Sequence, residues 1–131
     1  MSNEVSFRLG GPAKPIILVP TFVNRMGPYD FALDTGASLT ILSVELAESL
    51  GVKKGGSGMG IGAGGSIQVS MGSVNSVAVG RIEVREILVA VMDLAALSQA
   101  VGVRLLGIIG YNFLKSFRLT IDYPKRLLRL D

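Results

Sequence analysis

The sequence predicts a mainly β protein with one to three short helices, and three observations carry this prediction. Residues 67–71 and 117–123 alternate apolar and polar side chains with a period of two, as half-buried strands do. A β-branched run over 16–24 lies between glycines and prolines, which typically bound strands. The helix-like segments, 44–50 and 94–101, are short, and a glycine follows each.

In the first half of the chain, we expect an arm or strand over residues 1–15, a strand over 16–24, a turn over 24–28, strands over 29–33 and 39–42, and a helix over 44–50. Pro20 lacks a backbone N–H, so the first long strand should lie at a sheet edge or contain a bulge there. Ser43 can cap the helix, and Gly51 can end it.

The second half begins with seven glycines between residues 55 and 65, flanked by alternating segments, which predicts a glycine-tipped hairpin over 55–71. Beyond it we expect strands over 74–79 and 82–92, a helix over 94–101, a helix around 112–116 and a C-terminal hairpin over 117–131. With 131 residues, the chain should form one domain over 1–131.

Composition excludes several kinds of function. There is no Cys, His or Trp, which rules out thiolate catalysis, Ser-His triads, histidine or cysteine metal sites and disulfides. We therefore expect no metal and no cofactor, and any catalysis must use carboxylates, hydroxyls, Lys or Tyr. The net charge is +3, but the basic residues are scattered, so nucleic acid is not indicated as a partner.

No membrane segment is expected, because the longest apolar stretch, residues 16–23, is broken by Pro20 and is too short to span a bilayer. The first residues lack the features of a secretory signal, so the chain reads as cytoplasmic or as a domain of something longer, and its localisation stays open. Charged residues make up only 18%, which favours self-association.

The tripeptide Asp34-Thr35-Gly36 is the candidate for chemistry. Ala32 and Leu33 lead into it from a predicted strand, and an apolar strand follows it, so the Asp should lie in a tight loop against the core. The tripeptide alone is a weak signal, because it could also form a β-turn or a helix cap. In this context the segment resembles the catalytic loop of the retropepsin-like aspartic proteases.

The resemblance covers about residues 16–131. Ile61, Gly62, Ala63, Gly64, Gly65 and Ser66 are similar to the family's flap. Residues 106–110, with the helix at 112–114, are similar to the segment that packs behind the catalytic loop. Ser38 and Tyr111 stand where viral members carry an Asp–Arg pair, so the chain is nearer the cellular and bacterial branch and any dimer must rest on other contacts.

The resemblance implies a retropepsin-like acid protease fold, a closed barrel-like lobe that acts as a homodimer. It implies an aspartic endopeptidase in which two carboxylates about 3 Å apart share a proton and activate water. The chain has a single copy of the motif, so the second carboxylate must be Asp34 of a second subunit. Gly36 would allow close backbone approach, and Thr35 would bind across the dimer.

A polypeptide substrate is implied, lying extended between the two loops and beneath the flaps. The residues expected to contact it are Ala37, Ser38, Ile61, Gly62, Ala63, Gly64, Gly65, Ser66 and Ile109. The C-terminal hairpin would be the inter-subunit sheet, or it would pack within its own subunit.

Other interpretations stay open. The glycine run could be a surface loop, and its GxGxxG spacing suits a nucleotide site, although the alternation after it indicates a strand rather than a helix. Asp122 is more simply explained as a residue that sets up the turn at Pro124. The fold could also serve as a catalytically silent dimerisation or peptide-binding module.

Overall fold

The computed structural model describes residues 3–11, 15–62 and 65–131. In this part of the chain it contains strands β1 (Glu4–Ser6), β2 (Arg8–Gly10), β3 (Ile16–Val23), β4 (Met26–Leu33), β5 (Thr40–Ser43), β6 (Lys54–Gly62), β7 (Gly65–Val79), β8 (Ile82–Met92), β9 (Gly107–Ile109), β10 (Leu119–Asp122) and β11 (Leu127–Leu130), and helices α1 (Val44–Ser49), α2 (Ala95–Val101) and α3 (Tyr111–Leu114). The mainly β prediction with few short helices is confirmed.

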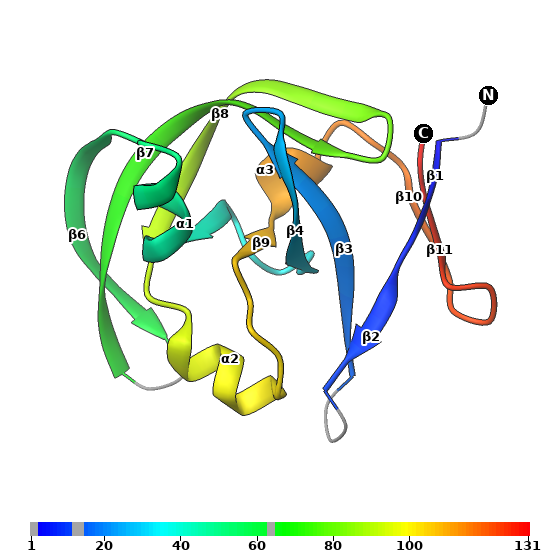
Figure 1. Cartoon of the computed structure of the whole chain (residues 1–131), viewed down its shortest axis with the longest axis horizontal. Coiled ribbons are helices and arrows are strands. Elements are labelled where there is room, and N and C mark those ends of the chain that lie inside the picture. Colours follow the sequence, from blue (N-terminus) through cyan, green and yellow to red (C-terminus); the bar gives the residue numbers. More distant parts are fainter. Residues whose placement is uncertain (1–2, 12–14, 63–64) are drawn as a thin grey trace.

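The larger sheet has the strand order β2-β3-β4-β9-β5-β8-β7-β6. An additional pairing between β3 and β7 closes its middle strands into a ring, and long, curved β7 and β8 arch over the molecule (Figure 1). The ring encloses a core of mostly β-branched and aromatic side chains that are almost fully buried, among them Val19, Phe31, Leu42, Val89 and Ile109. Burial of this apolar surface is the main contribution to folding.

Pro20 lies where strand β3 changes partners. On one side β3 pairs with β2 through residues 16–18 and with β7 through residues 21–23, and Pro20 falls between these ranges. On the other side, its pairing with β4 shifts register between Thr21 and Val23. The expected bulge is therefore present next to the proline.

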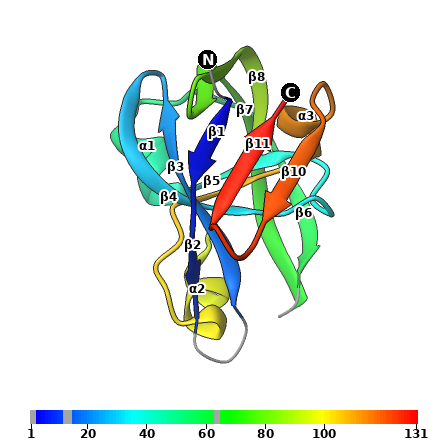
Figure 2. The ribbon, with the colours of Figure 1, turned by 90° about the vertical axis from the view of Figure 1, so that its right-hand side faces the viewer.

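The C-terminal hairpin packs within its own chain. Strand β11 is the centre of a three-stranded sheet, paired antiparallel with β1 on one side and β10 on the other. Figure 2 shows the three strands side by side, so the first and last strands of the chain belong to the same sheet. Because both edges of β11 are already paired, the hairpin packs within its own subunit, and an inter-subunit sheet would have to form through the outer strands β1 and β10.

The glycine-rich hairpin (residues 55–71) forms as predicted, since β6 and β7 pair antiparallel up to Gly62 and Gly65. Strand β7, however, runs on without a break to Val79, where a separate strand was expected from Val74. Gly72 does not end the strand. A Cβ at this position would lie 2.8 Å from the carbonyl oxygen of Lys53, so the glycine permits a close approach between backbones.

Helix α1 begins and ends as its sequence predicts. The hydroxyl of Ser43 accepts a hydrogen bond from the N–H of Leu46, at 3.1 Å, and Gly51 follows the helix with a φ of +67°. Helix α2 is ended by Gly102, whose φ is +78°. It covers a second apolar cluster that includes Leu18, Leu94 and Ile108.

Candidate active site

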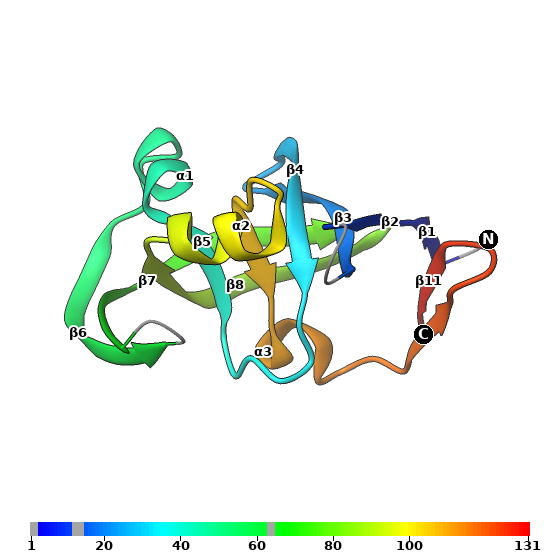
Figure 3. The same ribbon diagram turned by 90° about the horizontal axis from the view of Figure 1, so that it is seen from below.

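Residues 34–39 form the candidate catalytic loop, which connects β4 to β5. Strand β9 lies between these two strands, parallel to β4 and antiparallel to β5, so the loop crosses the end of β9. Seen from below, the loop lies beside helix α3, which directly follows β9 (Figure 3). The segment that the sequence places behind the motif therefore does lie behind it.

The backbone of the loop is held at both ends of the motif. The N–H of Asp34 donates to the carbonyl oxygen of Ile109 at 3.0 Å, which continues the β4–β9 pairing by one residue. The N–H of Ala37 donates back to the carbonyl of Asp34 at 3.2 Å, closing a turn around Thr35 and Gly36. The position of Asp34 is thus fixed by main-chain hydrogen bonds.

The start of helix α3 supplies two further donors to the loop. The N–H of Tyr111 donates to the carbonyl of Ala37 at 2.7 Å, and the N–H of Asn112 donates to the carbonyl of Ser38 at 3.2 Å. N–H groups in the first turn of a helix have no partner within the helix, so these bonds satisfy both the helix and the loop.

The side chain of Asn112 continues this connection. Its Oδ1 accepts from the N–H of Thr40 at 2.8 Å, and its Nδ2 donates to the carbonyl of Leu88 at 2.8 Å. Thr40 is fully buried, and its hydroxyl oxygen accepts from the N–H of Gly110 at 3.2 Å. The sequence pattern did not single out Thr40, and it predicted only that Asn112 lies in a helix. The one sequence signal for the supporting role of Asn112 was its place directly after Gly110 and Tyr111.

Gly110 is required by the closeness of the loop. A Cβ there would lie 2.9 Å from the nitrogen of Thr40 and closer still to the carbonyl group of Leu39. Real Cβ atoms do not approach backbone atoms so closely, so only glycine lets β9 pass directly beneath the end of the loop.

The carboxylate of Asp34 is exposed and oriented. Asp34, Thr35, Gly36 and Ser38 are exposed, and Ala37 is half-buried. The N–H of Gly36 donates to Oδ1 of Asp34 at 2.9 Å, and a Cβ on Gly36 would lie 3.3 Å from that oxygen. One carboxylate oxygen is thus held by the loop's own backbone, and the side chain is presented to the surface.

The other predicted site residues fall into three groups. Ile61 pairs with Ser66, and Gly62 with Gly65, in the backbone of the glycine-rich hairpin. Ala63 and Gly64 lie outside the described residues. Ile109 was expected to contact substrate, but its side chain is completely buried in the core, because its strand is flanked by β4 and β5. Its carbonyl oxygen accepts from the N–H of Asp34.

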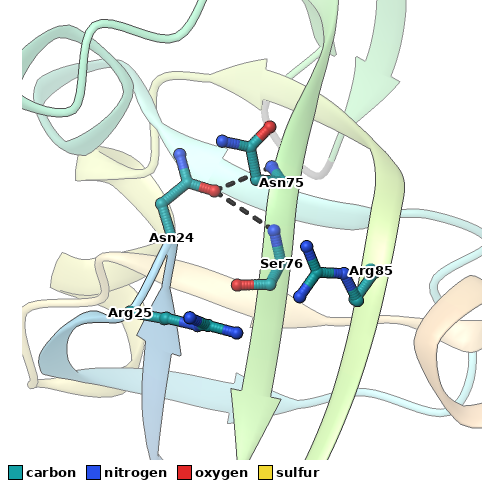
Figure 4. Close-up of a pocket in the computed structure, with 5 residues that line it drawn as sticks. All are labelled: Asn24, Arg25, Asn75, Ser76 and Arg85. Carbon is teal, nitrogen blue, oxygen red and sulfur yellow. Dashed lines mark hydrogen bonds between the residues drawn. The ribbon is translucent and has the colours of Figure 1, made fainter.

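A separate pocket lies away from the motif, where the β3–β4 turn meets β7 and β8. It is lined by Asn24, Arg25, Asn75, Ser76 and Arg85 (Figure 4). The Oδ1 of Asn24 accepts from the N–H groups of Asn75 and Ser76 at 2.8 and 3.2 Å. These bonds hold the turn between β3 and β4 against strand β7. Asn24 and Arg25, the residues of this turn, both have positive φ.

Among the described residues, no group of acidic side chains is close enough together to hold a metal ion. Within the same residues, no helix is both long and apolar enough to cross a membrane.

Comparisons with known proteins agree with this geometry. The family model described as aspartyl protease matches residues 19–113. A retropepsin-like aspartic protease from Rickettsia conorii superposes with a TM-score of 0.66 and 26% identity, over 95% of this chain and 96% of that one. A search of curated proteins found no match.

Two more distant structures share the fold. The retroviral protease-like domain of Ddi1 from Leishmania major has a TM-score of 0.60 and 22% identity, with 88% of each chain covered. The EIAV protease, solved with the inhibitor HBY-793, has a TM-score of 0.56 and 18% identity, over 80% of this chain and 90% of that one. The fold is therefore retropepsin-like, and the chain belongs to the aspartyl protease family.

Proposed function

We propose that this protein is an aspartic endopeptidase whose active site forms between two identical subunits, each contributing Asp34. The observation that carries the proposal is the exposed Asp34 carboxylate, oriented by the N–H of Gly36 on a loop whose backbone is fastened to β9 and α3. Rigid support of this kind is what a catalytic group needs in order to act at a fixed geometry. A single subunit supplies one such carboxylate.

The proposed chemistry needs no covalent intermediate. When two carboxylates approach to about 3 Å, they cannot both ionise easily, so they share one proton. The ionised Asp34 then takes a proton from a water molecule that attacks the scissile carbonyl. The protonated Asp34 of the partner subunit donates a hydrogen bond to the carbonyl oxygen as negative charge develops on it. The tetrahedral intermediate then collapses: the C–N bond breaks, and the proton that Asp34 took from water passes to the leaving amine nitrogen.

The substrate class follows from the surroundings of Asp34. An extended polypeptide would lie across the two loops, along Ala37 and Ser38, with the glycine-rich hairpins over it. Hairpin residues Ile61, Gly62, Gly65 and Ser66 would offer backbone groups for strand-like pairing with the peptide. Thr35 would bind across the dimer next to the dyad, and Ile109 would act only by holding Asp34.

The test is cleavage of a diverse peptide mixture at several pH values, with cut sites mapped by mass spectrometry. The wild-type chain should cut at acidic pH, and Asp34→Asn, which is nearly isosteric, should abolish turnover. Asp122→Asn is the matched control, because that carboxylate accepts the N–H of Lys125, at 3.0 Å, in the turn of the C-terminal hairpin. It should retain activity.

Mixing the two proteins tests the shared site. If each site needs Asp34 from both subunits, a ninefold excess of Asp34→Asn should leave about a tenth of the wild-type activity once the subunits have exchanged. Unchanged activity in the mixture would contradict a shared dyad. A wild-type protein that dimerises or binds peptides but cuts none of them would be a catalytically silent module.

A further inference from the structure

A shallow apolar groove lies directly beside the candidate catalytic loop, between helix α3 and the start of β10. It is lined by Thr35, Tyr111, Leu114, Lys115, Phe117 and Leu119. Tyr111 is 57% exposed, although it is one of the largest apolar-bodied side chains in the protein. The floor of the groove is firm, because Phe117 packs on buried Phe113 with ring centroids 5.9 Å apart.

The position of this groove ties it to the proposed dimer. If two Asp34 carboxylates meet, the two-fold axis passes close to Asp34, and Thr35 is both the next residue and part of the groove. Tyr111 keeps its place relative to the loop, because its N–H donates to the carbonyl of Ala37 at 2.7 Å. A second copy that completes the dyad therefore meets this surface.

The terminal sheet cannot supply the rest of the contact through its central strand. Both edges of β11 are paired within the chain. A stable interface buries roughly 800 Å² on each partner, more than two short loops provide. This groove is apolar surface that adjoins the loop at Thr35, with exposed Tyr111 beside it, and a buried tyrosine contributes on the order of 150–250 Å².

We propose that the groove is the main subunit contact of the dimer, in which Tyr111 of each subunit packs against the apolar wall of Leu114, Phe117 and Leu119 on the other. The contact is self-complementary, as a two-fold interface requires. This inference rests on the proposed function for the location of the axis. It assigns Tyr111 an interface role and no part in the chemistry.

The experiment measures the dimer dissociation constant of full-length variants by sedimentation equilibrium. Tyr111→Ala should raise the constant at least about tenfold, as expected for an aromatic residue at the centre of an interface. Tyr111→Phe should stay close to wild type, since the ring supplies the contact. Tyr123→Ala is the matched control: Tyr123 is 54% exposed and lies at the turn of the C-terminal hairpin.

The outcomes separate this inference from the endopeptidase proposal. An unchanged constant for Tyr111→Ala, a wild-type protein that stays monomeric, or an equal effect of Tyr123→Ala would overturn the interface. If Tyr111→Ala weakens the dimer while the wild type cuts no peptide, the interface stands and the catalytic proposal fails. In an active enzyme, the activity that Tyr111→Ala loses at low concentration should return when the protein is concentrated above its new dissociation constant.

Discussion

Asn112 joins three segments of the chain through one side chain and one backbone N–H. It contacts Ser38 in the candidate catalytic loop, Thr40 at the start of β5 and Leu88 in β8. An amide can donate and accept at the same time, which a carboxylate or an amine cannot do at neutral pH. This is why an Asn suits a position that faces an N–H on one side and a carbonyl on the other.

Asn112→Ala should lower the free energy of unfolding by about 1–3 kcal/mol, because it leaves the N–H of Thr40 and the carbonyl of Leu88 without their partner. Urea unfolding measures the loss. Asn75→Ala is the control, since Asn75 is exposed and should change stability by no more than about 0.5 kcal/mol. Equal effects of the two variants would mean that Asn112 does not support the loop.

At the scale of single residues, local sequence patterns predicted the candidate catalytic residue better than they predicted the residues that hold its loop in place. Asp34 was predictable because its tripeptide lies between two apolar strands. The pairing of Thr40 with Asn112 and Gly110 was not, because those contacts join residues 72 and 70 positions apart and leave no periodic trace. Ile109 was misassigned for a related reason: an apolar residue before a glycine looks the same whether it lines a cleft or a core.

The terminal strands show how one element can be predicted correctly while its pairing partners stay open. Alternation predicts β11 well, and Leu128 and Leu130 are buried as the pattern requires. Its neighbour β1 has three residues, too few for a period to be recognised. The sequence therefore did not predict the pairing of β1 with β11 that the structure shows.

Leu128→Ala should cost about 2–5 kcal/mol of folding free energy, since Leu128 is 1% exposed and belongs to the main core. Arg129→Ala, the next residue on the same strand, points outward and removes only an exposed ion pair with Asp131, so it should cost less than about 1 kcal/mol. Urea unfolding of both variants decides the matter. A loss for Leu128→Ala no larger than that for Arg129→Ala would contradict the assignment of β11 to the core of its own chain.

For the whole molecule, ten Asp and Glu side chains can make stability depend on pH. Glu83 is one of them. A hydrogen bond from Arg25 lowers the pKa of Glu83, against an opposing effect of desolvation, and the positive charges of Arg25 and Arg85 lower it further. A lowered pKa in the native state means that the ionised carboxylate favours folding.

This contribution is present above the ordinary pKa of a glutamate and is lost as the pH falls through the lowered native value. The unfolding free energy of the wild type should therefore fall more steeply than that of Glu83→Gln on acidification below about pH 5. Urea unfolding at a series of pH values measures both slopes. Identical slopes for wild type and Glu83→Gln would refute the assignment.

The support of the candidate catalytic loop by β9 and α3 has a consequence for how the protein is made. The N–H of Thr40 can form its hydrogen bond only once Asn112, 72 positions later, has been added to the chain, and the N–H of Asp34 likewise needs Ile109. Contacts of such long sequence separation form slowly, because loop-closure entropy opposes them until much of the chain is in place. During synthesis the whole motif emerges from the ribosome long before the segment that fixes its shape. A nascent chain that has not yet reached Gly110 therefore carries Asp34 on an unorganised loop.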